Sequence, residues 1–363
     1  MIETLAGKAR FTLARNKSEG LRMLESVSVP IVTVGYRNAE DVARCLGSLA
    51  QLDPTPSFAV LICENGGPAA FERLLLALAA PEGPCPGDAV DISIPSAGFL
   101  RMRRLRLKTG IADVIVAEAK ENVGYAGGIN AWLEILATTP DWEGVWIVNP
   151  DATPLPNALA ELVKCAKLRG KGMVGSRVLI GGDTGIVDSR GLKWRKWLAS
   201  TKGVDLRASA AIEPDLNELE SRMDSATGAS VFVTRDCIER VGLMDERFFL
   251  YYEDLDWGLR AKEACGVSYA HHSIVPHEGG TTIGSGRDRS SRSKLSVYLD
   301  FRNRLIFVRK HYPAWYAWTI LVCAARAAEF LAVGKGEVFR AALSGLWAGI
   351  RGETGRPDRL FTT

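Results

Sequence analysis

The sequence predicts an α/β fold built on a parallel sheet. Two continuous apolar runs, 29–36 and 58–67, flank a helical pattern that places Val42, Leu46 and Leu49 on one face. Such runs are typical of strands buried on both faces, and a strand–helix–strand unit joins parallel strands. Hydrophobic residues make up 47% and charged residues 24% of the 363 residues, as in ordinary globular proteins. This composition excludes disordered and fibrous proteins.

The remaining elements follow in chain order. Residues 68–110 are less regular and contain a Leu/Ala-rich helix (71–80), a Pro/Gly loop (81–87) and a basic stretch (101–108). A strand, a glycine-rich loop (121–130) and a helix come next, followed by a strand (144–156), a helix (157–168) and a strand (173–182). A polar region (183–222) precedes a loop, strand and helix (225–242) that we expect Asp236 to cap, an amphipathic helix ending near 265, and a last strand and loop (267–284).

Charge and cysteine usage restrict the partners and the compartment. The net charge of +3 does not require nucleic acid as a partner. The seven cysteines are scattered without a CxxC pair, which excludes a zinc ribbon and fits free thiols in a reducing cytoplasm. The apolar segment 314–333 contains Arg326 and Glu329, each of which would cost about 2.5–3.5 kcal/mol at a bilayer centre. We therefore expect a cytoplasmic protein without a spanning helix.

Polar side chains stand near the carboxyl ends of the predicted strands, where parallel sheets bind ligands. Glu64 ends the second run, and its carboxylate can accept the imide N–H of a uracil or thymine ring; the alternative is a solvated loop glutamate. Asp151 ends a strand at a proline-rich turn. It can ligate a hard divalent cation together with substrate phosphates, or it is a turn aspartate that binds backbone N–H groups.

Three further patterns carry chemistry. The glycine-rich loop 121–130 lets a backbone approach a phosphate, or makes a tight strand–helix turn. Three acids between aromatic residues (251–257) offer a general base in an aromatic pocket, or simply suit a helix dipole. His277 precedes two glycines after a strand and is a candidate metal ligand, although a lone histidine is more often structural.

Taken in order, these motifs resemble the family 2 inverting glycosyltransferases, especially their rhamnosyltransferase-like branch. The similarity covers about residues 28–310 and rests on VTVGYRN (32–38), CEN (63–65), NVGYAGGIN (122–130), NPD (149–151), TGA (227–229), VGLMDERFFLYYEDLDWGLR (241–260), the segment from His277 to Thr282, and Arg302-Asn303. The resemblance implies a GT-A fold, with a mixed, mostly parallel central sheet flanked by helices. The sequence adds a C-terminal helical extension.

The resemblance also implies roles for individual residues. Asp254 stands at the position of the catalytic base, and Asp151 and His277 at positions that hold a divalent metal, magnesium or manganese. The implied nucleotide-binding residues are Thr33, Tyr36, Asn38, Glu64, Asn122, Gly127 and Asn130, and those near the donor sugar or acceptor are Thr227, Gly228, Glu253 and Trp257. Two departures matter: Glu64 replaces the usual Asp, and Asn149 replaces the first Asp of the DxD element.

We therefore expect an inverting, metal-dependent hexosyltransferase that moves a sugar, with rhamnose favoured, from a dTDP- or UDP-sugar to a hydroxyl of a glycan or lipid-linked acceptor. The expected parts are an N-terminal extension (1–27), a nucleotide-sugar-binding half (28–156), an acceptor-binding and catalytic-base half (157–300) and a C-terminal helical region (301–363). The alternatives are a non-catalytic sugar-nucleotide or glycan-binding protein of the same fold and a nucleotidyltransferase. The missing GxGxxG pattern disfavours a dinucleotide-dependent oxidoreductase.

Aromatic and basic residues near the C-terminus predict peripheral contact with the inner face of the cell membrane. Trp315, Tyr316, Trp318 and Trp347 lie among arginines and lysines, a mixture typical of the membrane interface. The basic stretch 101–108 would add attraction to anionic lipid. The alternative is a C-terminal helical hairpin packed on the domain.

Overall fold

The fold is organised around a nine-stranded mixed sheet. The computed structural model describes residues 19–181, 185–279, 293–332 and 334–357. Within them the strand order is β11-β7-β10-β6-β1-β2-β5-β4-β3, and only β4 and β10 run against the other strands. The strands are β1 Val29–Gly35, β2 Phe58–Glu64, β3 Val90–Ile92, β4 Phe99–Arg106, β5 Asp113–Ala119, β6 Gly144–Val148, β7 Met173–Ile180, β10 Ser230–Thr234 and β11 Val267–His277. The expected α/β fold with a mostly parallel sheet is confirmed.

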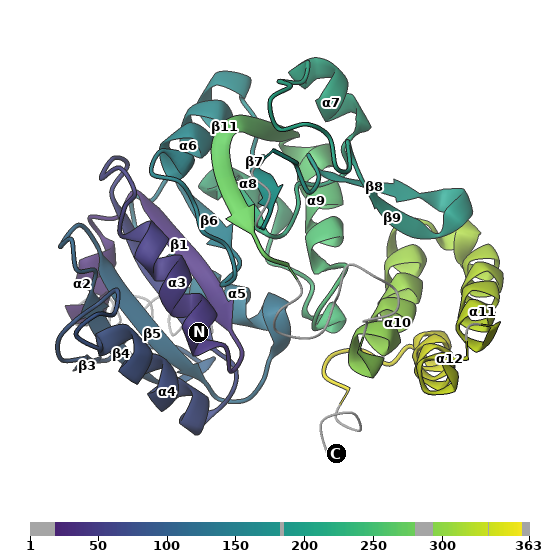
Figure 1. Cartoon of the computed structure of the whole chain (residues 1–363), viewed down its shortest axis with the longest axis horizontal. Helices are drawn as coiled ribbons and strands as arrows, with labels where there is room; N and C mark the ends of the chain where they lie inside the picture. The colour runs from purple at the N-terminus through teal and green to yellow at the C-terminus, as the bar shows by residue number, and fades with distance from the viewer. Residues whose placement is uncertain (1–18, 182–184, 280–292, 333, 358–363) are drawn as a thin grey trace, which may run out of the picture.

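Helices cover both faces of this sheet (Figure 1). One face packs against α3 (Ala39–Leu49), α4 (Pro68–Ala79) and α6 (Ala158–Arg169), and the other against α5 (Gly124–Leu136), α8 (Arg235–Val241) and α9 (Glu253–Ala264). Successive residues of β1 divide between the two cores: Ile31 packs in the core that contains Leu46 of α3, and Val32 in the core that contains Trp132 of α5. Burial on both faces explains why the strand is apolar throughout.

The C-terminal helices pack on the sheet domain and on one another. They are α10 (Lys294–His311), α11 (Tyr316–Ala332) and α12 (Gly336–Arg351), and the two-stranded hairpin β8 (Leu192–Arg195)–β9 (Ser200–Gly203) lies beside them (Figure 1). The α10–α12 contact is close, because a Cβ added to Gly345 would lie 2.2 Å from the carbonyl oxygen of Tyr298. None of the helices in the described ranges is long and apolar enough to cross a membrane.

Short elements complete the chain: α2 (Glu19–Leu24), α7 (Leu216–Arg222) and the 3₁₀ turns Lys196–Leu198, Glu246–Phe248 and Pro313–Trp315. α2 lies within the expected N-terminal extension, residues 1–27. Residues 1–18 of the expected N-terminal extension, and residues 280–282 of the histidine motif, lie outside the described residues.

The basic stretch 101–108 has a different setting from the one expected. Most of it is β4, near the edge of the sheet, and its arginines pair with acids: Arg101 with Glu72 (2.6 Å) and Glu118 (2.5 Å), and Arg104 with Asp113 (3.1 Å). This edge lies at the other end of the molecule from the C-terminal helices (Figure 1). The basic stretch and the C-terminal aromatic residues therefore do not form one surface.

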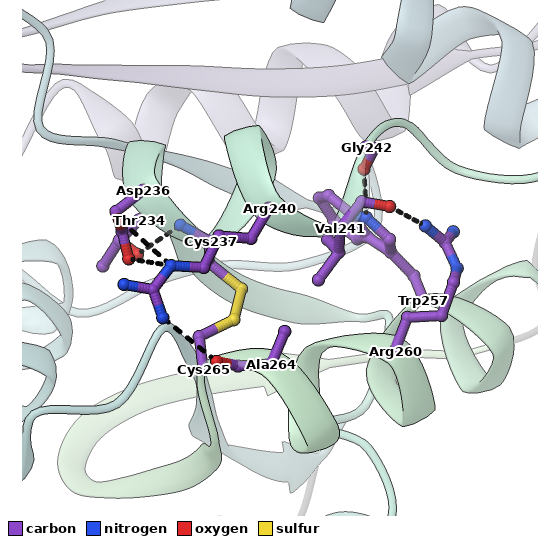
Figure 2. Close-up of a disulfide and its surroundings, with 10 residues drawn as sticks. All are labelled: Thr234, Asp236, Cys237, Arg240, Val241, Gly242, Trp257, Arg260, Ala264 and Cys265. Atoms are coloured by element: carbon purple, nitrogen blue, oxygen red, sulfur yellow. Dashed lines mark hydrogen bonds and ion pairs between the residues drawn. A yellow bond between two sulfur atoms is a disulfide. The ribbon is translucent and has the colours of Figure 1, made fainter.

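One cysteine pair corrects the expectation of free thiols throughout. Cys237 in α8 and Cys265, directly after α9, form a disulfide (Figure 2), whereas the other five cysteines are free. The two helices pack side by side: Trp257 Nε1 donates to the Gly242 carbonyl at 2.9 Å, and Arg240 donates to the Ala264 carbonyl at 3.2 Å. Because disulfides are rare in reducing compartments, cysteine usage no longer supports a cytoplasmic location.

The N-terminus of α8 also differs in detail. Thr234, rather than Asp236, is the capping residue, and its hydroxyl accepts a hydrogen bond from the Cys237 N–H at 3.2 Å. Asp236 lies in the first turn instead, where a negative charge still suits the helix dipole.

Candidate functional site

Glu64 lies at the carboxyl end of β2, next to the end of β1, and is fully buried. Its Oε1 accepts hydrogen bonds from the backbone N–H groups of Arg37 (3.1 Å) and Gly66 (2.7 Å). Its Oε2 has no hydrogen-bond partner among the described residues. Burial raises the pKa of this carboxyl group, although the two backbone hydrogen bonds oppose the rise. An unpaired buried oxygen is costly, which makes this atom a candidate acceptor for a ligand N–H group; it is covered in this arrangement and would meet a ligand only after the side chain turns outward.

The other predicted nucleotide-binding side chains differ in their availability. Asn38 accepts a hydrogen bond from the Tyr36 N–H (2.9 Å), and Asn122 accepts one from the Gly124 N–H (3.1 Å); both stand in turns that follow strands. Thr33 is fully buried within β1. The buried Asn130 amide is used by the chain itself, since it donates to the Met244 carbonyl (2.9 Å) and to Glu246 (2.7 Å). In this arrangement neither Thr33 nor Asn130 is open to a ligand.

The glycines of the 121–130 loop allow close packing. Gly124 has a φ of +75°, and a Cβ added there would lie 2.2 Å from the Phe249 carbonyl oxygen. The N–H of Tyr125 donates to that same oxygen at 2.8 Å. Gly127 is buried in α5, where an added Cβ would lie 2.8 Å from the Cβ of Val123. These contacts favour the tight-turn interpretation of the loop, with α5 fitted against residues 246–250.

Asp151 and His277 lie close together at the carboxyl ends of β6 and β11. Asp151 Oδ1 lies 3.1 Å from His277 Nε2, and Asp151 Oδ2 accepts a hydrogen bond from the Gly279 N–H at 3.1 Å. Asn149 is next to them, with its amide nitrogen 3.3 Å from His277 Nε2. Burial raises the pKa of Asp151, but the hydrogen bond and charge of His277 outweigh burial, so the pKa is lowered overall. Asp151 therefore carries a negative charge at neutral pH.

This pair fits a divalent cation that is completed by other ligands. The described residues contain no cluster of three or more His, Cys, Asp or Glu side chains that would hold a metal alone. Two neighbouring ligands of an octahedral cation, each at about 2.1 Å, are about 3.0 Å apart. The 3.1 Å between Asp151 and His277 matches this spacing, and the same distance is a hydrogen bond when no cation is present. Asp151 and His277 are the residues that would hold the metal, together with phosphate oxygens and water.

Glu253 and Asp254 begin α9, and the 225–230 segment packs directly on them. The Ser225 hydroxyl donates to the Asp254 carbonyl at 2.9 Å, and a Cβ added to Gly228 would lie 3.0 Å from Asp254 Oδ2. Burial raises the pKa of the Asp254 carboxyl group, partly offset by the backbone N–H groups of Leu255 and Gly228. Burial, followed by the charge of Asp254, raises the pKa of Glu253 well above its ordinary value. The pKa of each of these two neighbouring buried carboxyl groups is therefore raised.

A cavity of about 520 Å³ brings the predicted base and the metal side together. Its lining includes these predicted residues and their neighbour: Asn149, Thr227, Gly228, Glu253, Asp254 and His277. Sequence reasoning missed other lining residues: Tyr125, Ser200, Thr201, Asp300, Arg304 and Arg326. A signal existed for Tyr125, which replaces a phenylalanine of the family pattern. Trp257 lies elsewhere, in the core, with its Nε1 bonded to the Gly242 carbonyl.

Comparison with known proteins agrees with this architecture. No protein-family model matches the chain. The low-salt glycan biosynthesis hexosyltransferase Agl10 of Haloferax volcanii is 24% identical over 257 residues, which cover 68% of this chain and 79% of that protein. The crystal structure of GalNAc-T7 with UDP, GalNAc and Mn²⁺ matches with a TM-score of 0.53 and 11% identity, over 90% of this chain and 56% of that chain. The chain has a GT-A-type fold.

A further solved structure belongs to the mannosyltransferase PcManGT of Pyrobaculum calidifontis, in complex with GDP-Man and Mn²⁺. It gives a TM-score of 0.46 and 14% identity, over 89% of this chain and 87% of that chain. The fold and the sequence similarity together support a glycosyltransferase. This chain spans little more than half of the GalNAc-T7 chain, so the activity of that whole protein is not transferred to it.

In this GT-A-type fold, the Arg302-Asn303 motif holds the segment that leads into α9. Phe249, Tyr251 and Tyr252 have positive φ angles of 65°, 70° and 77°. Such left-handed conformations cost about 1–3 kcal/mol each in non-glycine residues. The two N–H groups of the Asn303 amide are shared among the carbonyls of Phe248 (2.8 Å), Leu250 (2.7 Å) and Tyr251 (3.0 Å), and Arg302 donates to the Phe248 carbonyl at 3.1 Å. These buried hydrogen bonds stabilise a strained turn immediately before Glu253.

Proposed function

We propose that the protein is an inverting glycosyltransferase that moves a sugar from a dTDP- or UDP-sugar to a hydroxyl group of a glycan or lipid-linked acceptor. The observation that carries the proposal is the single cavity lined by both Asp254 and His277. It offers a base and a metal-side ligand to one bound substrate pair. The GT-A-type fold and the similarity to a hexosyltransferase support this assignment.

The donor would bind across the carboxyl ends of β1, β2 and β6. Glu64 Oε2 would accept the imide N–H that thymine and uracil share, which is why dTDP- and UDP-sugars are both candidates. Asp151 and His277 would hold Mg²⁺ or Mn²⁺, which offsets the charge that develops on the leaving diphosphate. The preference for rhamnose rests on the similarity of the motifs to the rhamnosyltransferase-like branch.

The acceptor would react beside α9. Its hydroxyl oxygen attacks the anomeric carbon from the face opposite the diphosphate, forming the new glycosidic bond. The bond to the diphosphate breaks, and its electron pair leaves with the phosphate oxygen. Asp254 accepts the hydroxyl proton, and its raised pKa makes it a better base than an exposed aspartate. Glu253, whose pKa is raised by burial and by the charge of Asp254, lines the same cavity beside the base.

The first experiment titrates the purified protein calorimetrically with dTDP and UDP, with and without Mn²⁺. We expect binding that depends on Mn²⁺ and is lost in Asp151→Ala, and the tighter nucleotide identifies the donor class. The exposed Asp236, which pairs only with Arg240 in the described residues, provides the matched control Asp236→Ala. A well-folded protein that binds neither nucleotide would contradict the proposal.

The second experiment follows release of the nucleoside diphosphate from dTDP-rhamnose, with UDP-sugars in parallel. Asp254→Asn should keep nucleotide binding and lower turnover about 10²–10⁴-fold, the usual contribution of a general base. Asp236→Asn should turn over like the wild-type protein. Near-wild-type turnover by Asp254→Asn would remove Asp254 from the role of base. Nucleotide binding without turnover by the wild type would instead favour a non-catalytic binding protein.

A further inference from the structure

A row of exposed apolar side chains runs along α11 and continues onto the tip of the β8–β9 hairpin. On the helix, Trp318, Leu321 and Leu331 are exposed, and so are the alanines at 317, 324, 325 and 328. On the hairpin, Trp197 is 70% exposed and Leu198 47%. We call Trp197, Leu198, Trp318, Leu321 and Leu331 the hairpin–α11 surface. Trp318 and Leu321 are three residues apart, and the exposed alanines at 324 and 328 continue the row to Leu331 at spacings of three and four, along one side of α11.

Specific contacts join the hairpin tip to the helix. The Trp197 ring meets the Trp315 ring edge-on at 4.5 Å and lies 6.4 Å from the Trp318 ring. Trp318 Nε1 donates to the Trp197 carbonyl at 2.9 Å, and Arg326 donates to the Leu198 carbonyl at 2.9 Å. The tip is therefore held in place while its apolar side chains remain in solvent. An ordered apolar patch of this kind marks an interaction site.

The charges around this surface indicate what it contacts. The hairpin from 192 to 203 has no acidic residue and carries Lys193, which pairs with Asp224 at 2.9 Å, together with Arg195, Lys196 and Lys202. In α11 only Glu329 is acidic. Exposed tryptophan and leucine beside lysine are the mixture that binds the interface of an anionic bilayer, where each basic side chain adds about 1 kcal/mol. A symmetric contact with a second copy would instead bring the two basic hairpins together, which is unfavourable.

The surface is continuous with the catalytic cavity. Ser200 and Thr201 follow the hairpin tip in β9, and Arg326 lies within α11; all three line the cavity that contains Asp254. We infer that the hairpin–α11 surface lies on an anionic phospholipid membrane, with the cavity opening at the edge of this contact. The consequence for the acceptor rests on the proposed function: a hydroxyl group carried by a lipid would enter from the membrane side, past Ser200, Thr201 and Arg326.

Sedimentation with vesicles tests the contact, using the full chain. The wild-type protein should bind vesicles of phosphatidylcholine with phosphatidylglycerol more strongly than vesicles of phosphatidylcholine alone. The variant Trp197→Ser/Leu321→Ser should bind the vesicles at least about tenfold more weakly than the wild type. The control variant Leu76→Ser/Leu168→Ser removes two similarly exposed leucines from α4 and α6 and should bind like the wild type. Lys196→Gln/Lys202→Gln should weaken binding only to the anionic vesicles.

Three outcomes would overturn the inference. The first is a wild-type protein that stays in the supernatant with both kinds of vesicle at low salt. The second is a Trp197→Ser/Leu321→Ser variant that binds vesicles as well as its control. The third is a concentration-dependent dimer that this variant abolishes in the absence of vesicle binding, which would assign the surface to a second copy. Titration of the same proteins with dTDP and UDP keeps the two proposals apart, because nucleotide binding tests the proposed function alone.

Discussion

The Tyr125 hydroxyl lies between Asn149, which is next to the proposed metal ligands, and Gly228, which is next to the proposed base Asp254. Its oxygen lies 3.2 Å from both Asn149 Oδ1 and the Gly228 carbonyl, so its one proton is shared between two acceptors. Burial, together with the nearby carboxylates of Glu253, Asp254 and Asp151, raises the pKa of Tyr125, which keeps it protonated at any physiological pH. A phenylalanine at this position would fill the same space without making this link.

We therefore expect Tyr125→Phe to fold but to need more Mn²⁺ for nucleotide binding. Without the hydroxyl, the half-buried Asn149 amide beside His277 loses one partner, and the loss of a hydrogen bond costs about 0.5–1.5 kcal/mol. The measurement is the Mn²⁺ concentration that gives half-maximal dTDP or UDP binding, which should rise severalfold. Tyr316→Phe, which removes a hydroxyl bonded to the remote Arg309, is the control and should leave that concentration unchanged. An unchanged value in Tyr125→Phe would make Tyr125 a packing residue only.

Glu253 predicts a dependence of stability on pH. Because its folded-state pKa is raised, the folded protein binds this proton more tightly than the unfolded chain, and stability falls as pH rises above about 4.3, the ordinary value for glutamate. Glu253→Gln removes this loss. The free energy of urea unfolding should thus be similar for the variant and the wild type at acid pH. As pH rises, the variant should become more stable than the wild type.

Glu220 provides a control of opposite sign. Burial raises its pKa, but hydrogen bonds from Arg169 and Ser268 outweigh burial and lower it overall. Glu220→Gln should therefore lose stability relative to the wild type at neutral pH and lose less below the ordinary glutamate pKa. If the Glu253→Gln and wild-type curves run parallel from acid to neutral pH, Glu253 does not hold an unusual proton.

At the scale of elements, the turn before α9 is held largely by the Asn303 side chain of α10. The two N–H groups of its amide are shared among the carbonyls of Phe248, Leu250 and Tyr251. Without Asn303, the Leu250 and Tyr251 carbonyls would lose this partner, whereas the Phe248 carbonyl would keep Arg302. Asn303→Leu keeps a similar size and removes the donors. We expect the free energy of unfolding to fall by about 2–4 kcal/mol, the cost of losing several buried hydrogen bonds. Asn157→Leu, at an exposed helix start without a side-chain cap, should change it by less than about 0.5 kcal/mol.

Turnover gives a second measurement for the same variant. Since the strained turn sets the position of Glu253 and Asp254, Asn303→Leu should lower turnover at temperatures where it remains folded. Nucleotide binding at Glu64, on another part of the sheet, should persist. A loss of stability with normal turnover would show that the motif supports the fold without positioning the base.

The sequence could predict elements wherever burial imposes one pattern. Strands such as β1 and β2 pass through the middle of the sheet, so both faces must be apolar and the run is visible. The β8–β9 hairpin has no such pattern, because its exposed Trp197 and its lysines lie at the surface and not in the core. β3 was equally difficult to predict, since this three-residue edge strand is mostly exposed.

The candidate site shows the same limit at individual residues. Asp151, Asp254 and His277 were predictable as acids or histidine placed at the ends of elements, and the structure gathers them. Asn130 and Trp257 belong to equally recognisable motifs, but their polar atoms bind backbone carbonyls of residues 242–244. A motif identifies a position, whereas only the fold decides whether the side chain faces a ligand or the chain itself.

On the scale of the whole molecule, the C-terminal helices help to form the candidate site. α10 contributes Asp300 and Arg304 to the cavity and, through Asn303, holds the turn before the base. α12 holds α10 in turn, at a contact so close that Gly345 has no room for a Cβ. The expected C-terminal helical region is thus connected to the site by two successive contacts: α12 packs on α10, and α10 packs on the turn before α9. A small change in α12 should reach Asp254 even though it touches no substrate.

Gly345→Ala tests this chain of contacts, because two effects oppose each other. In an exposed helix the substitution stabilises by up to about 1 kcal/mol, since alanine is the better helix former. Here the new Cβ would lie 2.2 Å from the Tyr298 carbonyl oxygen, so α12 must move away from α10, and such overpacking costs about 1–3 kcal/mol. We expect a lower melting temperature and lower turnover with unchanged nucleotide binding. Gly336→Ala, in the same helix with open space around its Cβ position, should be neutral or stabilising. If Gly345→Ala behaves like Gly336→Ala, α12 does not hold α10 in place, and the C-terminal helices are an attachment to the enzyme and not a wall of its site.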